Sequence, residues 1–334
     1  MRARLITTYG LMTFLAIPAW RGAAAQAPAA TSRSLACNSD TAHVSTPAGM
    51  IAGSVLCPSA PAPWPVVLLI SGSGPTDRNG NSPMLPGENN SLRMLAEALA
   101  TRGIASVRYD KRGIGGSRSA MGSEADLRFD MFADDATAWT QQLRADSRFS
   151  TVTVAGHSEG SLLGMLATRR ANADAFVSIA GTGRPAAKVI HDQLVAGAPP
   201  ALVAEADRAM ARLVAGQTAD SVSPALAALF RPSVQPYLIS WFRYDPSAEL
   251  RRLDVPVLIV QGTTDIQVAV QDARLLAAAD PKATLVIIDG MNHVLKTVPA
   301  DQAAQVRSYS DPTLPVASQL IDAIATFVKG VRRR

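Results

Sequence analysis

Apolar and polar positions alternate along this chain in a pattern typical of repeated strand–helix units. Residues 66–70 form a short continuous apolar run, which is typical of a strand buried on both faces, and further strands are expected at 104–109, 151–155, 175–180, 255–260 and 284–288. Between them, apolar residues at helical spacing predict helices at 92–99, 132–143, from about 159, and at 268–279 and 316–329. Ser91 is expected to cap the first of these helices. The alternation predicts a mostly parallel central sheet flanked by helices, which is an α/β fold.

The segments outside this alternation complete the expected organisation. An extended stretch at 42–57 turns at 47–49 and predicts an opening antiparallel hairpin, whereas residues 26–40 are rich in Ala, Pro and Ser and are expected to be poorly ordered. Residues 184–254 contain helical stretches but no buried-strand pattern. Because long unstructured loops are rare in compact domains, we expect an inserted helical cap at 184–254 and a core at 41–183 and 255–330.

Three aromatic residues lie close together in the later part of this expected cap: Tyr237, Trp241 and Phe242. They are near enough in sequence to wall an apolar substrate pocket, and a bulky aromatic rim would favour short acyl chains. The alternative is that they only pack the cap onto the core.

The charge distribution indicates which kinds of partner the protein can be expected to bind. The net charge of +5 comes from basic residues near both ends, and the chain between them is slightly acidic, with no basic stripe interleaved with aromatic residues. A nucleic-acid partner is therefore not expected. No oligomeric state is predicted.

The N-terminal residues resemble a signal peptide. Arg2 and Arg4 precede an apolar stretch at 5–20, and Ala23 and Ala25 form an A-x-A cleavage site, which predicts a signal peptide at 1–25. A retained membrane anchor is the alternative, but the stretch is interrupted by polar residues and is shorter than the roughly 20 apolar residues that a span needs. We expect an exported protein, periplasmic or extracellular, with no stable membrane span after cleavage.

The chain has two cysteines, Cys37 and Cys57. Disulfides persist in oxidising compartments, so the expected export predicts a Cys37–Cys57 bridge. The alternative is that both are small buried residues with free thiols.

The strongest motif is Gly156-His157-Ser158-Glu159-Gly160, which matches G-x-S-x-G between an expected strand and an expected helix. A serine at the apex of such a tight turn needs glycines two residues before and after it, because side chains there would collide with neighbouring backbone. We predict that Ser158 is a nucleophile and that His157 points away beneath the turn.

A serine hydroxyl needs a base, and the chain has four histidines. His43 falls in the hairpin, His157 adjoins the nucleophile, and His191 falls in the expected cap. His293 alone follows the nucleophile on a loop beyond a sheet strand, so it is the expected base.

A carboxylate must orient that histidine. Asp265 follows the strand at 255–260, whereas its rival Asp289 lies directly at a strand end and is interpreted as a turn residue. The order Ser158, Asp265, His293 is the nucleophile–acid–base order of α/β-hydrolases.

Two backbone amides should stabilise the developing oxyanion. The amide of Glu159 follows the nucleophile directly, and the other is expected from the loop at 71–75, where we choose Ser73. The same region has two other interpretations. Gly72 and Gly74 begin a dinucleotide loop that fails at Asp77, and residues 77–88 form a calcium-like loop that lacks its required glycine. We therefore expect neither a cofactor nor a metal.

These residues resemble bacterial α/β-hydrolases of the serine-aminopeptidase-like and dienelactone-hydrolase-like type, which include short-chain esterases. The resemblance extends over about 65–296. The matching pieces are Gly72-Ser73-Gly74-Pro75-Thr76-Asp77-Arg78, Tyr109-Asp110-Lys111-Arg112-Gly113, Gly156-His157-Ser158-Glu159-Gly160, the loop at Asp265, and Asn292-His293. It implies hydrolysis of small acyl substrates through an acyl-enzyme, with carboxylic esters as substrates.

Three functions remain open on the sequence. A carboxylesterase is favoured. A peptidase or amidase using the same triad is the second, although no obvious acidic cluster for a peptide amino terminus appears apart from Glu159. A non-catalytic binding protein is the third, and it is disfavoured because all three catalytic positions are filled.

Overall fold

The computed structural model describes residues 35–334, and its centre is an eight-stranded sheet in the order β1-β2-β4-β3-β5-β6-β7-β8. Strand β2 pairs antiparallel with β1 and β4, and every other pair is parallel. The predicted parallel sheet and opening hairpin are therefore confirmed. The strands are β1 (Ser39–Thr46), β2 (Gly49–Leu56), β3 (Trp64–Ile70), β4 (Ala105–Tyr109), β5 (Phe149–His157), β6 (Ala175–Ile179), β7 (Val257–Gly262) and β8 (Thr284–Ile288).

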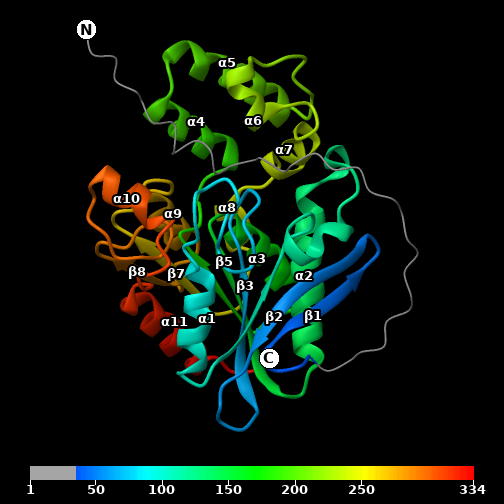
Figure 1. Cartoon of the computed structure of the whole chain (residues 1–334), viewed down its shortest axis with the longest axis vertical. Helices are drawn as coiled ribbons and strands as arrows, with labels where there is room; N and C mark the ends of the chain where they lie inside the picture. The colour runs from blue at the N-terminus through cyan, green and yellow to red at the C-terminus, as the bar shows by residue number, and fades with distance from the viewer. Residues whose placement is uncertain (1–34) are drawn as a thin grey trace.

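Helices cover both faces of the sheet and bury a separate apolar core on each (Figure 1). Alternate residues of β3 explain this division, since Val66 and Leu68 face one core whereas Val67 and Leu69 face the other. The first core packs against α2 (Phe129–Ala145), α3 (Glu159–Ala171) and α9 (Val270–Ala279), and the second against α1 (Ser91–Ala100) and α11 (Ser318–Gly330).

Residues 184–254 contain helices and no strand. The helices are α4 (Ala186–Gly197), α5 (Pro200–Val214), α6 (Ala227–Phe230), α7 (Gln235–Phe242) and α8 (Pro246–Leu250). Figure 1 shows α4 to α7 gathered beyond one end of the strands, whereas α8 lies near α3 and packs against α3 and α9. The helical layer over the sheet edge is thus formed by α4 to α7, and we call these four helices the cap.

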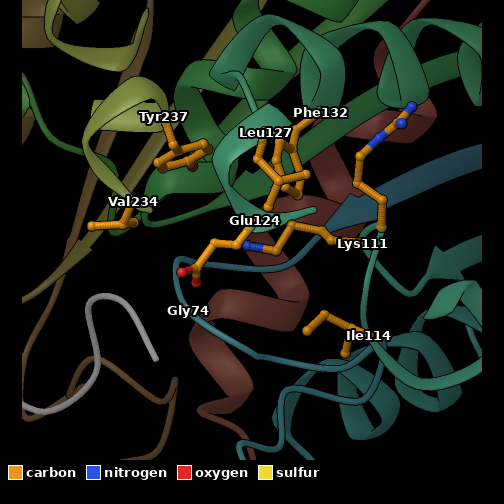
Figure 2. A pocket seen from close by; sticks show the side chains of 9 residues that line it. Gly74, Lys111, Ile114, Glu124, Leu127, Phe132, Val234 and Tyr237 are labelled. Carbon is orange, nitrogen blue, oxygen red and sulfur yellow. The ribbon is translucent and has the colours of Figure 1, made fainter. Parts of the chain in front are cut away.

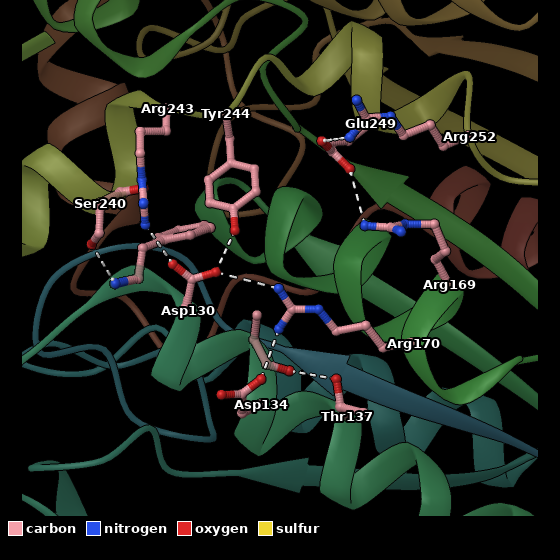
Figure 3. A network of polar contacts seen from close by, with 12 residues as sticks. Asp130, Asp134, Thr137, Arg169, Arg170, Ser240, Arg243, Tyr244, Glu249 and Arg252 are labelled. Carbon is pink, nitrogen blue, oxygen red and sulfur yellow. Dashed lines mark hydrogen bonds and ion pairs between the residues drawn. The ribbon is translucent and has the colours of Figure 1, made fainter. Parts of the chain in front are cut away.

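Ion pairs and hydrogen bonds join the residues just after α7 to the core at Asp130, in the first turn of α2 (Figure 3). Its carboxylate accepts hydrogen bonds from Tyr244, from Arg243 at 2.9 Å and from Arg170 of α3 at 3.3 Å. Beside this network, Trp241 of α7 stacks on Phe129 of α2 with ring centroids 5.8 Å apart. These contacts fix the end of α7 against α2.

Three local expectations differ from the structure. Residues 35–40, expected to be poorly ordered, are part of the fold: Leu35 is buried, Cys37 is bonded to Cys57, and β1 begins at Ser39. Ser91 does not cap α1 but is its first residue, and the capping position belongs to Asn90, at φ 54°. The third is α10 (Gln302–Ser308), a helix that the sequence pattern did not predict.

The disulfide predicted between Cys37 and Cys57 is present. The predicted signal peptide at 1–25 lies outside the described residues. Within residues 35–334, no helix combines the length and the apolar character that crossing a bilayer requires.

Candidate active site

The turn between β5 and α3 consists of a single residue, Ser158. Its backbone has φ 56° and ψ −123°, a conformation that residues with a side chain rarely adopt. A Cβ added to Gly156 would lie 2.0 Å from the carbonyl oxygen of Gly160, and one added to Gly160 would lie 2.5 Å from the carbonyl oxygen of Ile70. Both glycines are therefore required by close backbone packing, which is the reason the motif predicted.

Asp265 and His293 form a buried hydrogen-bonded pair on the loops after β7 and β8. His293 Nδ1 lies 2.8 Å from Asp265 Oδ2, and the other carboxylate oxygen accepts from the backbone amides of Gln267 and Val268 at 2.8 and 2.9 Å. An ionised carboxylate can only accept, so Nδ1 donates and Nε2 is left as the basic atom. Burial alone would raise the pKa of Asp265, but His293 and the two amides outweigh it and hold that pKa below its ordinary value.

The rival carboxylate, Asp289, has a different partner. It accepts a hydrogen bond from Thr263 Oγ1 at 2.9 Å, and the same hydroxyl accepts from the amide of Gly290 at 2.9 Å. Asp289 therefore ties the loop after β7 to the turn after β8, and the structure pairs His293 with Asp265.

The sequence suggested that His157 points away from the site, but in the structure its ring contacts the histidine loop. Its Nε2 donates to the carbonyl oxygen of His293 at 2.8 Å, and the two rings lie 4.8 Å apart. Burial, together with the neighbouring His293, lowers the pKa of His157 to about 3, so the ring is neutral. It joins the nucleophile turn to the histidine loop because both lie at the carboxyl edge of the sheet.

Ser158 and His293 are both 5% exposed. Among the described residues, no hydrogen bond joins the Ser158 hydroxyl to the His293 ring. Such contacts are commonly long when no substrate is bound. The three predicted residues thus lie at the carboxyl edge of the sheet, after β5, β7 and β8, with the Asp265–His293 contact already formed.

The loop at 71–75 lies directly against the nucleophile. A Cβ on Gly72 would be 3.1 Å from Ser158 Cβ and 3.3 Å from His157 Nδ1. Glu159 is the first residue of α3, so its amide has no acceptor within the helix. The segments that carry the two predicted oxyanion donors, Ser73 and Glu159, therefore adjoin the nucleophile.

A buried polar cluster beside Ser158 was not recognised from the sequence. Lys111 Nζ donates to the carbonyl oxygen of Gly72 at 2.5 Å and lies 3.3 Å from Glu159 Oε1. The hydroxyl of Tyr237, from the cap, donates to the other oxygen of Glu159 at 2.9 Å. Lys111 follows β4 at the carboxyl edge of the sheet, and this position, together with the matching piece Tyr109-Asp110-Lys111-Arg112-Gly113, was the available signal that it belongs to the site.

Two cavities adjoin this cluster. One is lined by Ser158, Glu159, Leu162, Thr182, Ala186, Val189 and Trp241. The other is bordered by Lys111, with Val234 and Tyr237 on one side and Ile114 on another (Figure 2). Trp241 therefore borders the cavity at Ser158 and Tyr237 the second, whereas Phe242 borders neither and packs against Trp241.

Comparisons with known proteins find similarity in sequence and in fold. Residues 88–226 match the family described as serine aminopeptidase, S33. The chain is 26% identical over 246 residues to Esterase EstD of Thermotoga maritima, a match that covers 73% of this chain but only 57% of that protein.

Solved structures resemble the fold. Est1E from Butyrivibrio proteoclasticus matches with a TM-score of 0.55 at 17% identity, over 86% of this chain and all of that one. The Pyrococcus furiosus esterase Pf2001 matches with a TM-score of 0.53 at 13% identity, over 87% of this chain and 89% of that one. The chain therefore has the α/β-hydrolase fold.

Proposed function

We propose that this protein, which has the α/β-hydrolase fold, is a serine esterase that cleaves carboxylic esters through an acyl-enzyme on Ser158. The observation that carries the proposal is the buried Asp265–His293 hydrogen bond on the loops beside the strained turn at Ser158. The esterase relative from Thermotoga maritima supports the same reaction class.

In the proposed reaction, Ser158 Oγ attacks the ester carbonyl carbon while its proton passes to His293 Nε2. The carbonyl oxygen becomes an oxyanion held by the amides of Ser73 and Glu159. The carbon–oxygen bond to the leaving alkoxide then breaks, and the alkoxide takes the proton from His293. Water repeats the sequence on the acyl-enzyme and releases the acid. Asp265 keeps Nδ1 as the donor and stabilises the imidazolium.

An aminopeptidase using the same residues is the second candidate, and the match over residues 88–226 favours it. Such an enzyme needs an anionic group for the substrate ammonium. Glu159 already contacts Lys111 and Tyr237, and Glu124 is bonded to Arg231 and Ser233. Because cations and hydroxyls already occupy both carboxylates, an uncharged ester fits the site better than an amino-terminal peptide.

The acyl preference is proposed to be for short chains. The cavity at Ser158 is small, and on the side of the cap the apolar side chains of Trp241 and Val189 line it. Trp241 is accordingly the wall residue of the three aromatic candidates. Tyr237 is proposed to act on Glu159, and Phe242 to support Trp241.

We also propose that the protein is exported, which the Cys37–Cys57 disulfide supports because such bonds persist in oxidising compartments. Mass spectrometry of the protein purified from its own cell envelope or medium tests this. A mature chain starting at Gln26 is expected, and an unprocessed chain retained in the cytoplasm contradicts it.

The reaction class is tested with a panel of p-nitrophenyl esters against aminoacyl p-nitroanilides. Ester turnover is expected, with nearly all of it lost in Ser158→Ala while the fold remains intact. A fluorophosphonate probe should label Ser158 and neither Ser73 nor Ser161. Faster turnover of the anilides would favour the aminopeptidase, and no turnover of any acyl substrate would revive a non-catalytic binding protein.

A further inference from the structure

Lys111 is a buried cation with a backbone carbonyl as its shortest contact. Its side chain is 4% exposed and that of Glu159 is 1% exposed. Nζ donates to the carbonyl oxygen of Gly72 at 2.5 Å, closer than its 3.3 Å separation from the Glu159 carboxylate. Removing two charges from water costs free energy of desolvation, so we expect the buried ammonium of Lys111 to have a functional role.

The Gly72 carbonyl belongs to the same peptide group as the Ser73 amide. A trans peptide is planar, so its C=O and N–H point in opposite directions. Holding the oxygen at Lys111 therefore fixes the direction of the Ser73 N–H. A cation on the oxygen also polarises the peptide and strengthens its N–H as a donor.

The other contact of Lys111 leads to the second expected donor. Glu159 binds the ammonium through Oε1, receives the Tyr237 hydroxyl on Oε2, and carries the free amide at the start of α3. One ammonium thus joins the loop that carries the Ser73 amide to the residue that carries the other amide.

We propose that Lys111 is a positioning residue of the oxyanion hole, which aims the Ser73 N–H at the reacting carbonyl oxygen by holding the Gly72 carbonyl. This inference rests on the proposed serine hydrolysis. It assigns Lys111 a part in the chemical step rather than in substrate affinity, because the oxyanion exists only after Ser158 has attacked.

The neighbouring residue offers a matched comparison. Arg112 pairs with Asp135 of α2, and the side-chain exposures of that pair are also 4% and 1%. The guanidinium of Arg112 hydrogen-bonds Asp135 and the carbonyl of Ala120, and within residues 35–334 it makes no hydrogen bond to the loop at 71–75, although it borders the same cavity as Gly74. Loss of this pair therefore removes an equally buried ion pair without touching the Gly72 carbonyl.

The test uses two neutral double variants, Lys111→Met/Glu159→Gln and Arg112→Met/Asp135→Asn, together with the single variant Lys111→Met. Both doubles remove the cation and the buried negative charge together, so each is designed to fold, which circular dichroism checks. Turnover of a p-nitrophenyl ester gives kcat and KM. An alkyl trifluoromethyl ketone, which forms an oxyanion adduct with an active-site serine, gives the affinity for a tetrahedral state.

Both Lys111 variants should lose on the order of 10² in kcat, the size of effect seen when one oxyanion donor is removed, with KM nearly unchanged. Affinity for the ketone should fall in parallel. The Arg112/Asp135 variant should keep the wild-type kcat. Wild-type kcat in the Lys111/Glu159 double variant would overturn the proposal, because Lys111 would then serve only to neutralise Glu159. An equal loss in the Arg112/Asp135 variant would also overturn it.

The rate of fluorophosphonate labelling at Ser158 separates this inference from the proposed function, since labelling needs the nucleophile and the oxyanion hole but no ester substrate. If the wild type cleaves no ester yet is labelled, and labelling slows in the Lys111 variants, the esterase proposal fails and the inference stands. Unchanged labelling in those variants overturns the inference alone. An unlabelled wild-type Ser158 overturns both.

Discussion

Among single residues, Asp265 is distinguished from Asp289 by its hydrogen-bond partners rather than by its distance from His293 along the chain. It accepts hydrogen bonds from Gln261, Gln267, Val268 and His293. Asp289 is closer to His293 along the chain, yet it bonds Thr263. Sequence reasoning distinguished the two by their positions after strands, and the contacts agree with that choice.

Asp265→Asn should therefore lower kcat by roughly 10⁴-fold, because an amide facing Nδ1 favours the wrong histidine tautomer and cannot stabilise the imidazolium. Steady-state kinetics on a p-nitrophenyl ester measures the loss. Asp289→Asn is the control, and its effect on kcat should be far smaller. The reverse ranking would exchange the roles of the two carboxylates.

His157 has a second consequence, for stability in acid. Its pKa in the folded protein is about 3, against an ordinary value of 6.5. Below pH 6.5 the unfolded chain binds a proton at this ring that the folded chain does not. The contribution of the neutral His157 ring to the free energy of unfolding is therefore fully present above about pH 6.5. It is lost as the pH falls toward 3, by up to about 1.4 kcal/mol per pH unit.

His157→Gln should make the acid decline shallower, since glutamine can still donate to the His293 carbonyl but does not titrate. Urea unfolding between pH 4 and 7 gives the free energy of unfolding of each protein. The wild type should lose stability more steeply than the variant over this range. Equal slopes would mean that His157 is not the group responsible.

At the scale of elements, the success of the predictions follows burial. Strands β3, β5 and β6 are buried on both faces, and β3 contains the continuous apolar run at 66–70. Helix α10 was missed because it is short and polar. Residues 35–40 were wrongly expected to be poorly ordered, because a disulfide and a hydrogen bond from Arg148 to the Leu35 carbonyl hold them in place. Neither contact can be predicted from local composition.

Site residues that follow local sequence features could be predicted, whereas those brought together by the fold could not. The triad positions follow motifs and strand ends, which are local features of the sequence. The contact between Tyr237 and Glu159 joins residues 78 apart, and the contact of Lys111 with Gly72 crosses between loops. No periodicity encodes such pairings, so the cluster that surrounds the nucleophile emerged only from the fold.

Helix α7 connects the cap to the proposed acyl cavity through Trp241. This side chain is 5% exposed, stacks on Phe129 and borders the cavity at Ser158. Trp241→Ala should enlarge the cavity and shift the preference among p-nitrophenyl esters toward longer acyl chains. It should also cost stability, by about 3 to 5 kcal/mol if the site does not collapse, because it empties a packed position.

Phe242→Ala is the matched control for that variant. Phe242 is also buried but borders neither cavity, so its loss should lower the melting temperature without changing the chain-length profile. The same profile shift in both variants, or an unchanged profile in Trp241→Ala, would mean that Trp241 only packs the cap.

Over the whole molecule, the sheet separates the candidate active site from the disulfide. The parallel strands direct Ser158, Asp265 and His293 to their carboxyl edge. Strand β2 runs the other way, and its Leu56 pairs with Ser106 near the start of β4. Cys57 therefore lies at the amino edge of β4, and Cys37 lies 3.5 Å from Arg148, just before β5. The disulfide and the candidate active site occupy opposite edges of one sheet.

This separation predicts that reduction affects stability and leaves catalysis intact. The bridge spans 20 residues, and closing a loop of that size in the unfolded chain is worth roughly 3 kcal/mol. The double variant Cys37→Ser/Cys57→Ser should melt at a lower temperature yet keep the wild-type kcat at 25 °C. Thiol titration of the unreduced, denatured wild type should find no free thiol. Two free thiols would refute the bridge, and a loss of kcat in a variant that is still folded would show that the two edges are coupled.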